Sequence, residues 1–513
     1  MGLRRGTRED GVMRLFTIGD SISQGFMSLG AARTQLAYST WIARALGVDV
    51  DDALSSPAYR VPDYPAHGLL LDLEVVLRRL QLAFGTTIDR LEWAAVLLEI
   101  NRVLDVAEEY YERGEGAGRY RGGSVPWFHN VSVYGFDVAD AWLVTPRLCR
   151  ERIAAAPGAK DGFFQGPNAA FYRTALRVLN PSRDERLDGY SQLDWLGHHA
   201  RGEGVENLLL WLGPNNAVGS AILLSVAATE DRPERRPVSL SFDERTRAQW
   251  NLWMPDDFVA EYGELLDRVD TLMRRNESPG WRVFVANVPH VTIVPIATGV
   301  GDPLPGLPRY YPYYTYPPLA RGTRLIEAGA PHLTAADARR IDETVDACNA
   351  RLVRLIEERN ARHRTPRYHL VDVSGGLDRL AYRRTGGEPS YEFPAYFAAN
   401  VAPPMDTRFY HVDRAGRRKA GGIVSLDGVH PSVIGQGLLA HEFLKVMKEA
   451  GVPGADPDRL PWPSIVASDT LYQDPIPLME EIYQYEELSY AVLSAYRYVF
   501  GGLQGRRGSI KDF

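Results

Sequence analysis

Ser21 is the first residue whose type and position suggest chemistry. It stands in the segment FTIGDSIS, directly after the short apolar run at residues 15–18. Such a run is typical of a buried parallel strand, and open α/β sheets place their sites at the carboxyl ends of their strands. A serine at that edge can act as a nucleophile. The tripeptide Gly19-Asp20-Ser21 is short, however, and it also fits a turn glycine followed by a capping serine.

A histidine with an acidic neighbour lies near the other end of the chain. In the segment SLDGVHPS, Asp427 precedes His430 by three residues, and Pro431 with Ser432 opens a predicted helix. A histidine held at a rigid helix start, with a carboxylate one short turn upstream, suits a general base and the group that orients it. By itself the pattern D-x-x-H is common, and it also fits a capping aspartate and a loop histidine.

Two further segments put hydrogen-bond donors at strand ends. Gly135 directly follows the apolar run NVSVY, and Asn215 stands two residues beyond Gly213 at the end of NLLLWL. Acyl transfer from an ester needs donors aimed at the developing oxyanion. The amides of Ser21 and Gly135, with the side-chain amide of Asn215, are predicted to supply them.

In order and in strand position, these four segments resemble the four blocks of the SGNH, or GDSL-type, hydrolases. The resemblance implies Ser21 as the nucleophile, His430 and Asp427 as its triad partners, and Ser21, Gly135 and Asn215 as the oxyanion hole. The chemistry it implies uses no cofactor and no metal. One position departs from the family pattern: Asn216 stands where the third block of the family usually carries Asp.

The elements that must position these residues alternate between strands and helices. Helical patterns near 256–273 and 334–362 separate apolar runs of strand type at 15–18, 130–134, 207–212, 282–288 and 368–373. Alternation of this kind predicts the α/β class, with a parallel sheet covered on both faces. The resemblance implies a three-layer α/β/α sandwich on a five-stranded parallel sheet.

Large additions are predicted around this core. We expect a hydrolase domain over 1–454, with a helical insertion at about 50–125 beside the pocket, as lid or specificity wall, and a Pro/Tyr-rich loop at about 302–320. A helical extension follows at 455–513. Its amphipathic pattern suits a helix that packs either on the body or on a second copy of the chain, which would make a homodimer through this helix.

Three residues outside the blocks are candidates for substrate binding. His290 follows the fourth predicted strand at the expected edge of the sheet, and Tyr310 and Tyr313 belong to the Pro/Tyr-rich loop. Aromatic side chains can wall an acyl or aryl pocket or stack on sugar rings. The loop equally fits a stiff segment that only packs on the surface.

Composition excludes several other classes. The 513 residues carry a net charge of −7, which offers no footprint for nucleic acid or anionic lipid. Two widely separated cysteines favour free thiols in a reducing compartment. The N-terminus lacks the apolar run of a signal peptide, and prolines interrupt the longest uncharged stretch, so we expect no transmembrane segment and a cytoplasmic location.

The sequence lacks the motifs of several other enzyme classes. It contains no G-x-S-x-G, H-E-x-x-H, C-x-x-C or P-loop pattern. The adjacent pair His198 and His199 fits a solvated helix surface better than a metal site. The sequence therefore predicts a serine esterase or lipase acting on small-molecule or lipid esters. An acyltransferase on the same scaffold and a non-catalytic binding module are the alternatives.

Overall fold

The computed structural model describes residues 14–484 with short gaps. The gaps are residues 31–32, 51–58, 65–71, 118–124, 157–166, 232–235, 318–319, 321–322, 328, 386–388 and 402–403.

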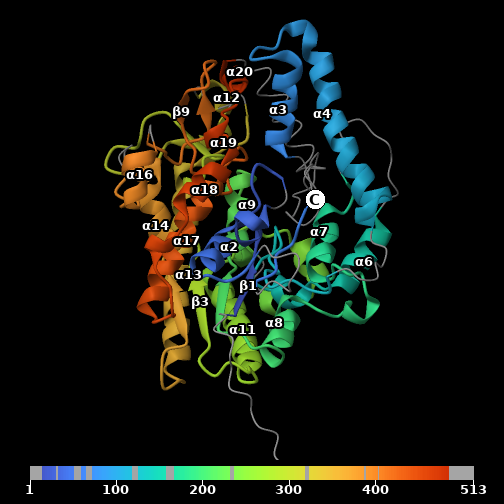
Figure 1. Ribbon diagram of the computed structural model, residues 1–513. Helices are drawn as coiled ribbons and strands as arrows, with labels where there is room; N and C mark the ends of the chain where they lie inside the picture. Colours follow the sequence, from blue (N-terminus) through green and yellow to red (C-terminus); the bar gives the residue numbers. More distant parts are fainter. Residues whose placement is uncertain are drawn as a thin grey trace, which may run out of the picture.

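A parallel sheet of four strands forms the centre of the molecule (Figure 1). Its order is β1 (Leu15–Gly19), β2 (Asn207–Trp211), β3 (Arg282–Ala286) and β7 (Tyr368–Val371). Each of these strands coincides with an apolar run of the sequence, as expected for parallel strands that are buried on both faces. The α/β class is therefore confirmed.

The predicted fifth strand is not confirmed. Residues 129–133 run parallel to β1 but form only an isolated bridge, in which Thr17 pairs with Asn130. Backbone hydrogen bonds still join the segment to β1, since the Val131 amide donates to Thr17 at 3.1 Å and the Val133 amide to Gly19 at 3.2 Å. The amides that point away from β1 donate to side chains: Ser132 to Asn130 at 3.0 Å and Tyr134 to Gln24 at 2.9 Å. The segment still lies at the outer edge of β1.

Helices cover both faces of the sheet. Alternate strand residues Leu15, Leu209 and Phe284 pack with α2 (Tyr38–Ala45) and α17 (Val433–Glu449). Phe16, Leu208 and Val283 point the other way, into the core formed with α8 (Gln192–Arg201), α11 (Pro255–Met273) and α13 (Ala335–Asn360). Residues buried on both faces explain why these strands read as continuous apolar runs rather than alternating ones.

The chain changes direction around β1. It passes first to the segment 129–133 on one side of β1 and then crosses to β2 on the other side. In open α/β sheets, the crevice outside the carboxyl ends of the strands at such a reversal is where ligands bind. The end of β1, and hence Ser21, lies at this point.

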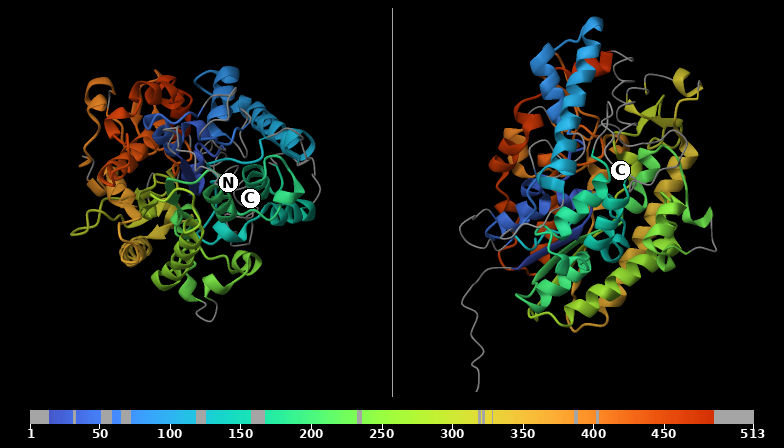
Figure 2. Two further views of the ribbon diagram at one scale, coloured as in Figure 1. Left: turned by 60° about the horizontal axis from the view of Figure 1, so that its bottom comes forward. Right: turned by 90° about the vertical axis from the view of Figure 1, so that its right-hand side faces the viewer.

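The predicted helical insertion is present. Helices α3 (Leu73–Phe84) and α4 (Trp93–Glu108) project from the body beyond the sheet (Figures 1 and 2). Their apolar faces share a cluster with Leu471, Ile476 and Leu426. Since Leu426 precedes Asp427, the insertion contacts the loop that carries the predicted triad.

The remaining additions were only partly foreseen. The Pro/Tyr-rich loop contains strand β5 (Tyr313–Thr315), which pairs antiparallel with β4 (Thr298–Val300) and β6 (Leu333–Thr334). Three residues are too few to give a readable alternation. At the C-terminus the structure describes α20 (Met479–Gln484), and the rest of the predicted helix, with the proposed dimer face, lies outside the described residues.

The cysteines and the helix lengths can also be compared with the expectations from sequence. Both cysteines, Cys149 and Cys348, are free and buried. Among the helices that the structure describes, none has the length and apolar character needed to cross a bilayer.

Candidate active site

A sharp turn from strand to helix presents Ser21. Strand β1 ends at Gly19, and Asp20 caps the short helix α1 (Ser21–Gln24) by accepting from the Ile22 amide at 3.0 Å. A Cβ atom on Gly19 would lie 2.2 Å from the Ser23 Oγ, so the turn requires glycine there. The turn leaves Ser21 largely buried, with 7% of its surface exposed.

Ser21, His430 and Asp427 form a continuous hydrogen-bonded chain. The Ser21 Oγ lies 2.9 Å from the His430 Nε2, and the His430 Nδ1 lies 2.9 Å from the Asp427 Oδ2. An ionised carboxylate can only accept, so Nδ1 carries the ring hydrogen and Nε2 is left to accept from the serine hydroxyl. This is the arrangement in which a histidine can take the proton of a nucleophile.

Asp427 is completely buried and held from several sides. It accepts from the backbone amides of Leu29 at 3.1 Å, Val429 at 2.9 Å and His430 at 2.8 Å. Burial by itself would raise the pKa of Asp427, but the facing His430 and these hydrogen bonds hold the pKa below its ordinary value. The carboxylate therefore stays ionised and fixes the ring, which Phe26 packs against at 4.7 Å between ring centres.

Two of the predicted oxyanion donors, Gly135 and Asn215, lie at neighbouring turns. Gly135 has a left-handed backbone with φ of 75°, and the Asn215 Nδ2 donates to the carbonyl of Phe136 at 2.9 Å. That bond uses one of the two amide hydrogens of Asn215 and leaves the other available. Within the described part of the chain, the backbone amides of Ser21 and Gly135 donate to no acceptor. Gly135 and Asn215 thus lie beside each other with a donor left available on each, and Ser21 offers its own backbone amide.

The departure at Asn216 has a structural reason. Asn216 is buried, its Oδ1 accepts from the Val138 amide at 3.2 Å, and its Nδ2 faces the Glu261 carboxylate at 3.5 Å. Glu261 in turn pairs with Arg245. An aspartate at 216 would set a second buried carboxylate against Glu261, whereas the neutral amide can donate to it.

Asp20 is an acidic residue of the site that the sequence analysis gave no role. It is fully buried, and its Oδ2 has no hydrogen-bond partner among the described residues. Burial raises the pKa of Asp20 to about 7, against smaller opposing effects of the Ile22 amide and His430. A carboxyl group that titrates near neutral pH therefore directly precedes the nucleophile in the chain.

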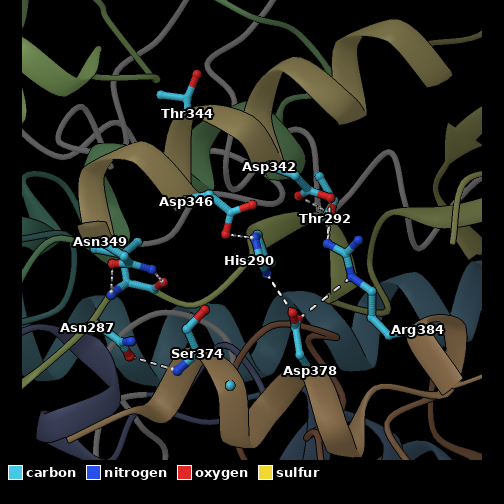
Figure 3. Close-up of polar contacts among 12 residues, drawn as sticks. Asn287, His290, Thr292, Asp342, Thr344, Asp346, Asn349, Ser374, Asp378 and Arg384 are labelled. Atoms are coloured by element: carbon cyan, nitrogen blue, oxygen red, sulfur yellow. Dashed lines mark hydrogen bonds and ion pairs between the residues drawn. The ribbon is translucent and has the colours of Figure 1, made fainter. Parts of the chain in front are cut away.

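His290 lies at the same edge of the sheet, in a cluster of charged groups (Figure 3). Its Nδ1 is 2.9 Å from Asp378 on α14 (Val373–Leu380), and its Nε2 is 3.0 Å from Asp346 on α13. Burial would lower the pKa of His290, but the hydrogen bond to Asp378 and the charges of Asp342 and Asp378 raise it. The carboxylate on each nitrogen favours the charged form of His290 and leaves neither nitrogen free to act as a base.

The two candidate tyrosines contact other groups than the triad. The Tyr310 hydroxyl donates to Asp342 at 3.0 Å, and the Arg384 guanidinium lies over its ring. The Tyr313 ring meets His332 edge to face. These contacts join Tyr310 to the charged cluster of His290 and Tyr313 to the small antiparallel sheet.

The prediction of a solvated surface for His199 is wrong. His199 is buried, and its Nδ1 lies 2.6 Å from Glu203, which also contacts the Nε2 of His129 at 3.0 Å. The Arg60 amide donates to the Nδ1 of His129 at 2.7 Å. The Nε2 of His129 must then carry the ring hydrogen and has no lone pair for a metal, so this group is a hydrogen-bonded cluster.

No family model, curated protein or solved structure matches this chain.

Proposed function

We propose that this protein is a serine esterase that hydrolyses carboxylic esters through a covalent acyl-enzyme. The observation that carries the proposal is the hydrogen-bonded chain from Ser21 through His430 to Asp427, at 2.9 Å for each step. It joins the turn after the first strand to the loop before α17, at the sheet edge where sites of open α/β sheets lie. The resemblance to the SGNH hydrolases supports the same assignment.

In the first step, the Ser21 Oγ attacks the ester carbonyl while the His430 Nε2 takes its proton. The carbonyl oxygen becomes an oxyanion, for which the Ser21 and Gly135 amides and the Asn215 side chain are the donors. When the intermediate collapses, the bond between the acyl carbon and the alcohol oxygen breaks. His430 then returns its proton to the leaving alcohol, and the acyl group remains on Ser21.

In the second step, a water molecule replaces the alcohol. His430 takes a proton from the water, the resulting hydroxide attacks the acyl carbon, and Ser21 leaves with the proton from His430. Asp427 remains ionised throughout and stabilises the imidazolium. The released product is the free carboxylic acid, and the reaction uses no cofactor.

The experiment that tests this proposal is a series of p-nitrophenyl esters, from acetate to decanoate, given to the wild type and to Ser21→Ala. We expect turnover in the wild type and none above background in Ser21→Ala, with matched circular dichroism spectra. Retained turnover in the variant would remove Ser21 from the mechanism. Product analysis with added 1-butanol separates hydrolysis from acyl transfer, because a transferase would form the butyl ester.

A non-catalytic binding module gains little support from the site. Such a module has no need for a serine in hydrogen-bond contact with a histidine whose tautomer is fixed by a buried carboxylate. A wild type that is folded but inactive towards every ester of the series would favour it.

A further inference from the structure

An apolar pocket lies next to the loops that carry the triad. Its cavity volume is about 90 Å³. Its lining includes residues that adjoin the reactive groups in the chain: Ile22 after Ser21, Pro214 before Asn215, and Val429 and Pro431 on either side of His430. The pocket is therefore lined by the same turns and loops that present the reactive groups.

Beyond these residues the pocket runs between two helices of one face. Aliphatic side chains of α14 and α17 line it together with the loop that follows β3, namely Leu377, Leu380, Leu438, Leu439, Val291 and Ile293. Most of these side chains are buried in the protein. Their surface offers contact to a hydrocarbon and no partner for a polar ligand.

The polar residues of the lining are already engaged by the protein. His290 has a carboxylate on each ring nitrogen, as described above. Glu442 accepts from the Tyr391 hydroxyl at 2.7 Å and from Lys445 at 3.0 Å, and Thr407 accepts from the Tyr382 amide at 2.9 Å. A polar or charged ligand would have to displace these bonds, whereas a hydrocarbon chain would not.

We infer that this pocket binds the aliphatic chain of the ester substrate, so that the substrates are esters with a medium-length alkyl chain. The inference rests on the proposed esterase function. Chain neighbours of both Ser21 and His430 line the pocket, so the same chemistry fits a chain on the acyl side or on the alcohol side.

Gly376 gives a direct way to fill the pocket. It lies within α14 and lines the pocket, and a Cβ atom there would meet only the Glu442 Cγ at 3.9 Å and the Arg379 Nη2 at 4.0 Å. Gly376→Leu therefore puts four carbon atoms into the pocket without a clash at Cβ. Replacing a glycine inside a helix also favours the folded state.

Gly263→Leu is the matched control. Gly263 lies inside α11, where a Cβ atom would meet only the Leu355 Cδ2 at 4.0 Å, and it does not line the pocket. Leu377→Ala makes the opposite change, because it enlarges the pocket by removing a side chain from its wall. It keeps the inference testable even where Gly376→Leu does not fold.

The measurement is kcat/KM along two series: p-nitrophenyl esters from acetate to decanoate, and alkyl acetates from ethyl to decyl. In the wild type we expect a rise of about fourfold for each methylene group until the pocket is full. Gly376→Leu should shorten the best chain by about four carbons and leave the shortest esters unaffected, and Leu377→Ala should lengthen it. Gly263→Leu should follow the wild type.

The series in which the shift occurs identifies the chain. A shift in the p-nitrophenyl series assigns the pocket to the acyl group, and a shift in the alkyl acetates assigns it to the alcohol. Turnover with the same profile in wild type, Gly376→Leu and Leu377→Ala in both series would overturn the inference while the esterase function stands.

A binding measurement separates this inference from the esterase function. Calorimetric titration with sodium decanoate should show binding to the wild type and to Gly263→Leu, and at least tenfold weaker binding to Gly376→Leu. Such binding in a protein that cleaves no ester would refute the proposed function alone. Equal affinity of all three proteins for decanoate, together with unshifted ester profiles, would refute the pocket assignment.

Discussion

Two histidines lie at the carboxyl edge of the sheet, and each has an aspartate on its Nδ1. The Nε2 of His430 meets the hydroxyl of Ser21, whereas the Nε2 of His290 meets a second carboxylate, that of Asp346. A hydroxyl can donate to the bare nitrogen of a neutral ring, whereas two ionised carboxylates, one at each nitrogen, favour the charged ring that carries a hydrogen on both. The second partner, rather than the place in the fold, therefore distinguishes the proposed base, His430, from His290.

The largest effect is expected from replacing His430, the proposed base. His430→Ala should lower kcat by about 10⁶, because the nucleophile loses the group that takes its proton. The double variant Ser21→Ala/His430→Ala should lose no more than either single variant, since the residues act as one unit. Steady-state kinetics on a p-nitrophenyl ester measures both, and losses that simply multiply would contradict the shared role.

The next largest effect is expected on stability, from a substitution in the charged cluster around His290. Arg384→Leu should destabilise the protein by about 3–5 kcal/mol, because it leaves the buried Asp342 carboxylate without its cation. Urea unfolding measures this cost. Turnover of p-nitrophenyl acetate by the folded variant should stay close to that of the wild type.

The control for Arg384→Leu is Arg339→Leu. Arg339 and Glu343 both lie on α13, and this substitution removes the exposed ion pair between them. Its cost should stay below about 1 kcal/mol. Equal costs for the two variants would mean that the charged cluster does not hold the fold together.

A third prediction concerns Asn215, a proposed oxyanion donor. Asn215→Ala should lower kcat by about 10²–10³, as expected for the loss of one oxyanion donor, with little change in KM. The protein should stay folded, because Asn215 is only partly buried and makes one hydrogen bond to Phe136. An unchanged kcat would exclude Asn215 from the oxyanion hole.

The smallest effect is a difference in pH dependence. The pKa of His290 lies above its ordinary value of 6.5, so its contribution to stability is complete below that pH and is lost as the pH rises through the folded-state pKa. His290→Gln should lack this loss. Unfolding midpoints of the two proteins between pH 6 and pH 9 should therefore converge as the pH rises, and parallel curves would show that His290 is not held as a cation.

The residues around Ser21 and His430 were largely predictable from sequence, because most of them stand directly after predicted strands. Ser21, Gly135 and Asn215 each follow an apolar run, and parallel strands bring their carboxyl ends to one edge of the sheet. His430 was readable from Asp427, three residues before it. The contact between His430 and Ser21 could be expected only from the resemblance, since 409 positions separate them.

The charged cluster around His290 was not predictable, because its contacts come from distant helices. The carboxylates that hold His290 lie 56 and 88 residues further along the chain, with no local signal to pair them with it. The burial of His199 depends on a contact with Glu203 that His129 completes from another segment. Likewise, no local pattern indicates that the Tyr134 amide donates to the side chain of Gln24, 110 positions away.

The long separation of Ser21 from His430 also has a consequence in time. At a synthesis rate of about 5–20 residues per second, the base leaves the ribosome roughly 20–80 s after the nucleophile. Throughout that interval the growing chain carries a serine without its proton acceptor. Under the proposed mechanism, a translation product that stops before residue 430 would lack the base and would hydrolyse no ester.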